Sequence, residues 1–277
     1  MGRATESPPP SPTTGATARS GSRLISRLTA RSSALLAAIA AACALLCGDF
    51  VAAAVPASAP AAPLNAAAPA GSVLIEAYGD STTLGTSCSN GRCGPLAQNA
   101  VTWLQDALHG DFGANVSVTN LGVGGSMASQ LLDGVCHGRC PTFAARMAVS
   151  SARIVTFNYG INEVMQNQTP EQFYAAETAL VKAARAAGKQ PVLETSNPMP
   201  DRHLNAKLAA MVEMTRRVAA EQHVPLVDQY AYISGLPDWQ AMMSDGAHPK
   251  PELYRLKARE SYAVLDPLVR RLLRDAS

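Results

Sequence analysis

VLIEAYGDS, residues 73–81, joins a short apolar run to a Gly-Asp-Ser turn. Apolar side chains occupy both odd and even positions of the run, as is typical of a strand that is covered on both faces. Strands of this kind belong to parallel sheets, in which ligands bind beside the carboxyl ends of the strands. Ser81 is therefore expected at a sheet edge that a ligand can reach.

Other segments of the chain predict the rest of the architecture. Similar apolar runs follow at 116–120, 154–157, 191–194 and 225–228. Helical patterns separate them, the clearest at 170–187, 204–222 and 251–274. Thr169 and Pro170 start the first of these helices and Gly188 ends it. This alternation predicts an α/β fold: a three-layer α/β/α sandwich around a central, mostly parallel five-stranded sheet.

The first 59 residues predict an export signal with an extended basic n-region. Arg19, Arg23, Arg27 and Arg31 precede an apolar stretch at 34–46. Small residues typical of cleavage sites follow at 52–54 and 57–59. The alternative is a membrane anchor, but Gly48-Asp49 interrupts the stretch before it reaches the roughly 20 residues that a span needs.

The remaining chain is expected to be one exported domain. We expect a flexible Ala/Pro linker at 60–71 and a single folded domain at 72–277. The protein would be periplasmic or secreted, with no stable membrane span after the leader is cleaved. An uncleaved leader, or a lipid anchor on Cys43, is the less favoured alternative.

The charge balance gives no reason to expect nucleic acid as a partner. The chain holds 23 basic and 21 acidic residues, and residues 1–59 account for five of the bases and two of the acids. The rest therefore holds 18 bases and 19 acids, a net charge of −1. Such a domain has no electrostatic attraction to a polyanion.

Four cysteines follow the leader: Cys88, Cys93, Cys136 and Cys140. An even number in an exported chain indicates disulfides, with three possible pairings, of which the local pairs are the simplest. The alternative is a zinc site on Cys136, His137 and Cys140. It lacks both C-x-x-C spacing and a second cluster, so it is not favoured.

Polar groups follow several of the predicted strands. They are Asp80-Ser81 after the first, 122–126 after the second, 160–163 after the third, and Asp245 with His248 before the last helix. Each segment alone fits an ordinary turn. Because all of them would lie at the same edge of a parallel sheet, they predict one common site.

Ser81, His248 and Asp245 are the candidate catalytic residues. A serine hydroxyl is a poor nucleophile until an imidazole takes its proton, and a carboxylate can orient that imidazole. Asp245, three residues before His248, can reach the other ring nitrogen across one turn. The G-x-S-x-G elbow of ordinary α/β-hydrolases is absent, because Thr83 stands at its last position.

The four segments together resemble the SGNH, or GDSL-type, hydrolase superfamily. Ser81 matches the nucleophile, Gly125 the glycine of the second block, Asn162 the asparagine of G-x-N, and His248 the histidine of D-x-x-H. The resemblance covers residues 72–277 and is greatest to single-domain bacterial esterases, lysophospholipases and thioesterases. One departure is Glu163, where the third block usually reads G-x-N-D.

The resemblance implies a flavodoxin-like sandwich and a Ser-His-Asp hydrolase. The oxyanion would be bound by the N–H groups of Ser81 and Gly125 and by the Asn162 amide. No metal or organic cofactor is implied, and the substrate would be a small-molecule or lipid ester cleaved by a monomer. We expect acyl esters or thioesters; the alternatives are a carbohydrate O-acetyl esterase or a catalytically silent glycan- or lipid-binding relative.

Several apolar side chains near the candidate segments are expected to line a substrate pocket. They are Met165, Met199, Leu236, Trp239 and Met242. Flexible methionines would give an acyl chain an adaptable wall. The alternative is that most of these side chains belong to the hydrophobic core.

Overall fold

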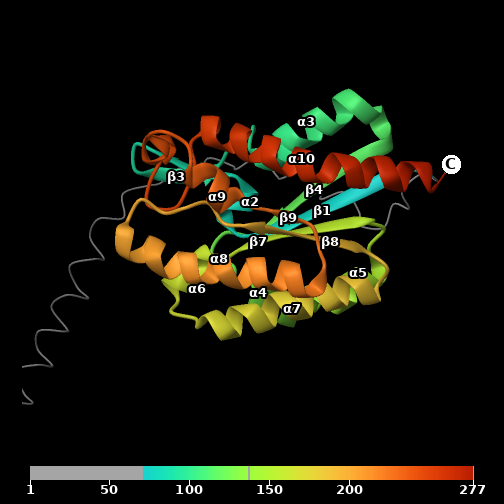
Figure 1. Cartoon of the computed structure of the whole chain (residues 1–277), viewed down its shortest axis with the longest axis horizontal. Helices are drawn as coiled ribbons and strands as arrows, with labels where there is room; N and C mark the ends of the chain where they lie inside the picture. The colour runs from blue at the N-terminus through green and yellow to red at the C-terminus, as the bar shows by residue number, and fades with distance from the viewer. Residues whose placement is uncertain (1–70, 137, 277) are drawn as a thin grey trace, which may run out of the picture. The chain divides into compact units, whose positions relative to one another are not determined.

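Five parallel strands form the central sheet of the computed structural model, which describes residues 71–136 and 138–276 (Figure 1). In chain order they are β1 (Val73–Gly79), β4 (Val116–Gly122), β7 (Ile154–Tyr159), β8 (Gln190–Thr195) and β9 (Leu226–Val227). All five coincide with the predicted runs to within two residues. The predicted export signal and all of the predicted linker except its last residue lie outside the described residues.

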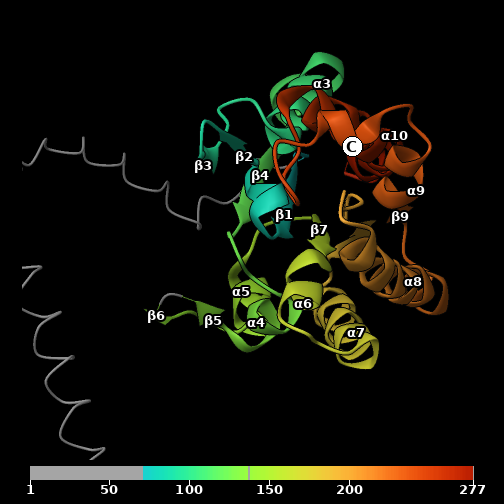
Figure 2. The ribbon, with the colours of Figure 1, turned by 90° about the vertical axis from the view of Figure 1, so that its left-hand side faces the viewer.

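Helices cover both faces of this sheet (Figures 1 and 2). One layer holds α3 (Ala100–Phe112) and α10 (Pro251–Arg274). The other holds α4 (Ala128–Asp133), α5 (Phe143–Val149), α7 (Pro170–Ala186) and α8 (Arg202–Gln222). The predicted three-layer α/β/α sandwich is therefore confirmed. None of the described helices combines the length and the apolarity needed to cross a membrane.

Short elements occupy the connections. They are the helices α2 (Ser81–Leu84), α6 (Ile161–Met165) and α9 (Gln229–Ser234), the 3₁₀ turns η1 (Gly113–Asn115) and η2 (Trp239–Met242), and the hairpins β2 (Thr86–Ser89) with β3 (Arg92–Pro95) and β5 (Val135–Cys136) with β6 (Gly138–Arg139). Disulfides close both hairpins, Cys88–Cys93 and Cys136–Cys140. The local pairing is confirmed, and a zinc site on Cys136 and Cys140 is excluded because their sulfurs are bonded to each other.

Alternating side chains of each strand feed two separate cores. Val73 and Ile75 of β1 face α3 and α10, together with Ile154 of β7. Val155 and Phe157 of β7 face α5, α7 and α8 instead. A strand that buries both its odd-numbered and its even-numbered side chains must lie inside a sheet with helices on both sides. The apolar runs alone therefore predict this layered arrangement.

The connections place a switch point at the end of β1. The strand order is β4-β1-β7-β8-β9, so the chain leaves β1 for β4 on one side and then passes to β7 on the other. Ligands bind at such points in open α/β sheets, because neighbouring loops diverge there. The register brings the strand ends level: Gly79 of β1 pairs with Gly122 of β4 and Asn158 of β7.

A close approach of the backbone at this edge requires glycine. A Cβ on Gly122 would lie 2.3 Å from the backbone nitrogen of Leu84, and a Cβ on Gly79 would lie 2.0 Å from Oγ1 of Thr83. Because both positions lack a side chain, α2 packs directly against the ends of β1 and β4. Ser81, the first residue of α2, is held at the level of the strand ends.

Glu163 joins the loops that follow β4 and β7. Its side chain is fully buried. Oε2 accepts a hydrogen bond from the Gly160 N–H and Oε1 accepts one from the Ala128 N–H, each at 2.8 Å. Burial raises the pKa of Glu163 to about 7, although the hydrogen bond from Ala128 opposes the shift. The glutamate that departs from the G-x-N-D pattern thus has a structural role between two loops.

We expect Glu163 to make stability depend on pH near neutrality. Its pKa in the fold, about 7, lies above its ordinary value of 4.5, so its contribution is complete below pH 4.5 and is lost as pH rises through 7. The full change is on the order of 3 kcal/mol. In urea unfolding, the free energy of unfolding of wild type should fall relative to that of Glu163→Gln as pH rises from about 5 to about 8, because wild type loses this contribution.

The matched control is Glu171→Gln, in the first turn of α7. Glu171 is fully exposed and its pKa lies below the ordinary value. The free energy of unfolding of Glu171→Gln should therefore change with pH in the same way as that of wild type in this range. A constant difference between wild type and Glu163→Gln from acid to neutral pH would contradict the prediction.

Candidate active site

Ser81 stands at a sharp strand-to-helix turn after β1. Asp80 caps the helix: its Oδ1 accepts hydrogen bonds from the Thr82 N–H at 2.7 Å and the Thr82 hydroxyl at 2.8 Å. Gly85, at φ +92°, ends the helix after one turn. Ser81 is the first helical residue, so its N–H has no partner within the helix. The hydroxyl and this N–H both lie at the switch point.

His248 bridges Ser81 and Asp245. Its Nε2 lies 2.9 Å from Oγ of Ser81, and its Nδ1 lies 2.7 Å from Oδ2 of Asp245. Oδ1 of Asp245 accepts from the N–H groups of Ala247 and His248, each at 2.7 Å. The D-x-x-H spacing therefore folds into one compact turn in which both carboxylate oxygens are used.

The electrostatics keep Asp245 ionised. Partial burial pushes its pKa upward, but the hydrogen bonds from the His248 ring and from the Ala247 and His248 N–H groups outweigh it. The net direction is a pKa below the ordinary value. A carboxylate that stays charged holds the proton of His248 on Nδ1 and leaves Nε2 free to accept the serine proton.

The loop that carries His248 is closed at its base. Met243 and Pro249 form an antiparallel bridge. Ser244 donates two hydrogen bonds to the His248 carbonyl, from its N–H at 2.8 Å and from its hydroxyl at 2.9 Å. The imidazole is thus held from its own backbone as well as from Asp245.

A buried lysine supports the same loop from α10. Lys257 Nζ donates to Oδ1 of Asn197 at 3.1 Å, and Nδ2 of Asn197 donates to the Ala247 carbonyl at 3.1 Å. Burial lowers the pKa of Lys257, while the negative charges of Glu194 and Asp80 oppose that shift. The sequence does not predict this contact, because Asn197 and Lys257 lie 60 positions apart and carry no motif.

The loops after β4 and β7 bring hydrogen-bond donors close to Ser81. Gly125 has φ +75°, a left-handed conformation that favours glycine, and a Cβ there would meet nothing within 4 Å. Among the described residues, the N–H groups of Ser81 and Gly125 have no hydrogen-bond acceptor. Asn162 Nδ2 lies 3.0 Å from the Ser126 carbonyl and 3.4 Å from Oδ2 of Asp80.

A cavity of about 450 Å³ opens in front of these groups. Its lining combines the polar residues with an apolar wall and consists of Ser81, Gly125, Ile161, Asn162, Met165, Met199, Asp201, Leu204, Asp245, Gly246, Ala247 and His248. The predicted Met165 and Met199 lie here. Ile161, Asp201 and Leu204 were not predicted, since no motif marks a residue at a helix start that faces a cavity.

The other three predicted pocket residues lie elsewhere. Leu236, Trp239 and Met242 pack with Ile233, Met243, Leu253 and neighbouring side chains in a separate apolar cluster beneath α10. None of the three lines the cavity. Their closeness in sequence to Asp245 does not carry them to the site, because their side chains pack in this apolar cluster instead.

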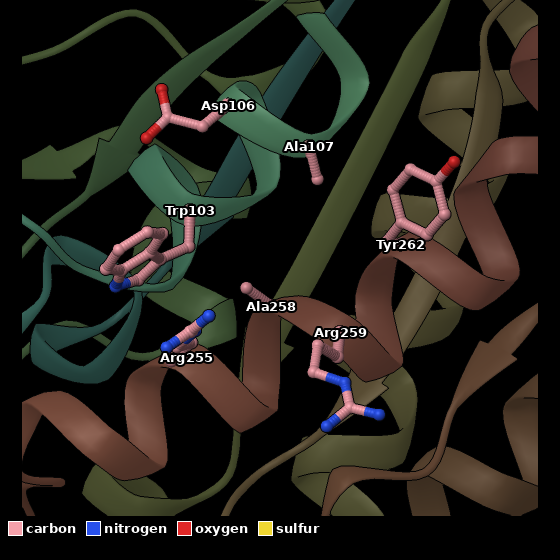
Figure 3. Close-up of a pocket in the computed structure, with 7 residues that line it drawn as sticks. All are labelled: Trp103, Asp106, Ala107, Arg255, Ala258, Arg259 and Tyr262. Carbon is pink, nitrogen blue, oxygen red and sulfur yellow. The ribbon is translucent and has the colours of Figure 1, made fainter. Parts of the chain in front are cut away.

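A second hollow of about 420 Å³ lies between α3 and α10 (Figure 3). Arg255 stacks over the Trp103 ring, 5.2 Å from its centroid. The lining of this hollow includes Asp106, Arg259 and Tyr262 but no serine, cysteine or histidine. It offers no nucleophile with a base beside it, and the reactive groups gather in the first cavity.

The donor atoms near the site do not fit a metal ion. Cys88, Cys93 and Asp245 place potential ligand atoms within 4.8 Å of one another. The two sulfurs are joined in a disulfide and cannot act as thiolate ligands. One carboxylate alone would remain for a metal.

Solved structures with a similar fold include esterases. The aryl esterase of M. smegmatis is 16% identical, with a TM-score of 0.58 over 71% of this chain and 100% of that one. A catalytic mutant of an acetylxylan esterase from Geobacillus stearothermophilus is 17% identical, with a TM-score of 0.56 over 70% and 94%. A lipolytic protein of the G-D-S-L family from Veillonella parvula is 18% identical, with a TM-score of 0.55 over 70% and 99%.

These identities support the shared fold only. Comparison with curated protein sequences gives no significant match. The model of the GDSL-like lipase/acylhydrolase family matches residues 77–256, a range that runs from β1 into α10 and contains all three candidate catalytic residues. Because this match spans well over half of the chain, the protein belongs to the GDSL-like lipase/acylhydrolase family.

Proposed function

We propose that this protein is an exported serine esterase that cleaves acyl esters or thioesters through an acyl-enzyme intermediate. One observation carries the proposal: Ser81, His248 and Asp245 form a continuous hydrogen-bonded relay, with links of 2.9 and 2.7 Å. A serine can attack a carbonyl at neutral pH only when such a base stands beside it. The relay opens into a cavity rather than into the core.

The first half of the reaction forms the acyl-enzyme. Ser81 Oγ attacks the ester carbonyl while His248 Nε2 takes its proton, and Asp245 stabilises the imidazolium. The tetrahedral intermediate then collapses, and His248 gives the proton to the leaving alcohol or thiol. In the second half, water attacks the acyl group by the same route and releases the acid.

The negative oxygen of the intermediate needs donors that are already in place. The unpaired N–H groups of Ser81 and Gly125 supply two of them. Asn162 supplies the third, by exchanging its 3.4 Å contact with Asp80 for the substrate oxygen. The two N–H donors act without reorganisation, because the backbone fixes them before the substrate arrives.

The cavity wall favours an acyl chain. Ile161, Met165, Met199 and Leu204 present apolar surface on one side of the nucleophile. Met165 is 55% exposed and belongs to this wall, so its side chain is accessible to an acyl chain. The alternative substrate is an O-acetyl group on a carbohydrate, which would leave this wall unused.

The proposed export rests on the basic and apolar leader and on the two disulfides. Disulfides persist in oxidising compartments and are rare in reducing ones. A periplasmic or secreted esterase would keep both bonds intact during its working life.

Replacing Ser81 by alanine should abolish turnover and covalent labelling by a fluorophosphonate probe. The probe requires an activated serine, so wild type should be labelled and Ser81→Ala should not. The control is Ser87→Ala, in β2, which should label like wild type. Absence of labelling in folded wild type would instead favour a catalytically silent binding protein.

Asp245→Asn should lower kcat by roughly 10³- to 10⁴-fold while the thermal midpoint of unfolding stays nearly unchanged. The amide keeps the shape of the side chain but loses the charge that supports the imidazolium. Asp238→Asn, earlier in the same connection and outside the cavity, is the control. Equal activity in Asp245→Asn and wild type would remove Asp245 from the mechanism.

Acyl chain length should test the apolar wall. With nitrophenyl esters, kcat/KM should be highest for medium chains, because each buried methylene contributes about 0.8 kcal/mol. Met165→Ala should lower kcat/KM for the octanoate about fivefold and leave the acetate within about twofold. Val149→Ala, an equally exposed apolar truncation outside the cavity, should change neither. Activity on acetylated sugars alone would favour the O-acetyl esterase.

A further inference from the structure

The β2–β3 hairpin lies against the loop that carries Asp245 and His248. It follows α2 directly, so only a few residues separate Ser81 from Cys88 along the chain. Figure 2 faces this end of the molecule and shows α2 with the hairpin beside it. A segment that starts at the nucleophile therefore ends beside the acid and base.

Two hydrogen bonds hold the hairpin there, and its disulfide makes a further close contact. The Tyr254 hydroxyl of α10 donates to the Thr86 carbonyl at 2.6 Å. The Cys88 N–H donates to the Ser244 hydroxyl at 3.0 Å, and the same hydroxyl donates to the His248 carbonyl at 2.9 Å. Ser244 thus joins the hairpin to the backbone of the base.

The third contact is made by the disulfide itself. Sγ of Cys88 lies 2.9 Å from Oδ2 of Asp245 and 3.9 Å from Nδ1 of His248. Because Cys88 is bonded to Cys93, its sulfur has no proton to donate, and the contact is not a hydrogen bond. A polarisable, apolar atom therefore packs directly against the carboxylate oxygen that holds His248.

We propose that the Cys88–Cys93 disulfide is a positioning element of the catalytic relay, which makes the activity sensitive to thiol reductants. This inference rests on the proposed function. The bond fixes Cys88 against the Asp245–His248 pair, so that the carboxylate keeps a single orientation. A more rigid carboxylate supports the imidazolium better during each turnover.

The hairpin is too short to stay folded and docked without the bond. β2 and β3 contain four residues each and pair only with each other. Isolated two-stranded hairpins of this size are marginal in water. Asn90 and Gly91 form the turn with positive φ, which suits a hairpin but adds no core. The disulfide between the paired Cys88 and Cys93 supplies the missing restraint.

The redox step balances with a dithiol as reductant. Its thiolate attacks one sulfur of the disulfide, a mixed disulfide forms, and the second thiol displaces the other cysteine. Cys88 and Cys93 end as two thiols and the reductant as a cyclic disulfide. Re-oxidation returns the two electrons to an oxidant such as a glutathione disulfide, which restores the bond.

The second disulfide provides a matched control. Cys136–Cys140 closes the β5–β6 hairpin, and neither cysteine lines the cavity or contacts the relay. We would compare wild type, Cys88→Ser/Cys93→Ser and Cys136→Ser/Cys140→Ser with nitrophenyl acetate. Each kcat is divided by the number of sites that a fluorophosphonate labels at completion, so that unfolded molecules do not count.

We expect Cys88→Ser/Cys93→Ser to lower kcat per labelled site about tenfold and to leave KM within about twofold, because Cys88 does not line the substrate cavity. Cys136→Ser/Cys140→Ser should leave both constants within about twofold of wild type. Dithiothreitol should produce the same loss in this control variant, and re-oxidation should reverse it. A chelator is included, because reduced Cys88 and Cys93 beside Asp245 would bind zinc.

Ser244→Ala gives an independent readout. It keeps the disulfide but removes the hydroxyl between the hairpin and His248, and we expect about a threefold lower kcat. The triple variant Ser244→Ala/Cys88→Ser/Cys93→Ser should have a kcat no lower than that of Cys88→Ser/Cys93→Ser alone, because both changes act through the docking of the hairpin.

Two outcomes separate the failures. If wild type neither labels nor hydrolyses esters, the proposed function fails. If wild type is active but Cys88→Ser/Cys93→Ser retains its kcat per labelled site, even with fewer sites labelled, the disulfide only stabilises the fold and the inference is overturned.

Discussion

The level ends of β1, β4 and β7 are the constraint on which the site depends. Gly79, Gly122 and Asn158 stand opposite one another in the parallel register, so the three following loops begin at one edge. A shift of one residue would turn every side chain of a strand to the other face. It would bury Ser81 or move it away from Gly125. The two cores on either side of the sheet therefore fix the geometry of the chemistry as well as the stability.

Buried ionisable groups are concentrated directly behind this edge. Asp80, Glu163 and Lys257 are almost completely buried, and each is held by at least one hydrogen bond. Burying ionisable groups costs free energy, which apolar replacements would avoid. These three groups connect loops that no apolar side chain could connect: Glu163 binds two backbone N–H groups, and Lys257 reaches the His248 loop through Asn197. Stability is given up here for a fixed arrangement of donors.

Local sequence patterns predicted the fold because each strand run and each helix start depends on only a few neighbouring residues. The apolar runs marked every strand of the main sheet, and Thr169-Pro170 marked the start of α7 with its cap. Motif spacing likewise placed Ser81 and the Asp245–His248 pair in one site, since parallel strands end together. Their catalytic roles stay a prediction.

Contacts between distant positions could not be predicted in the same way. Nothing in the sequence indicates that Cys88 contacts Asp245, because that depends on how the β2–β3 hairpin docks after the sheet has formed. Leu236, Trp239 and Met242 illustrate the opposite failure: closeness in sequence to Asp245 suggested a pocket, and packing placed them in the core. Direction of a side chain is decided by tertiary packing, which a single sequence does not record.

Two carboxylates near Ser81 differ in what they can do. Asp80 is adjacent in sequence, but burial raises its pKa, and its Oδ1 is occupied by Thr82 while its Oδ2 faces Asn162. Asp245 is distant in sequence, its pKa is lowered by its hydrogen bonds, and its Oδ2 faces His248. Environments that shift the pKa values of two acids in opposite directions give the two acids different roles. Asp245 can therefore support a positive charge on His248, whereas Asp80 holds the helix and the Asn162 amide around Ser81.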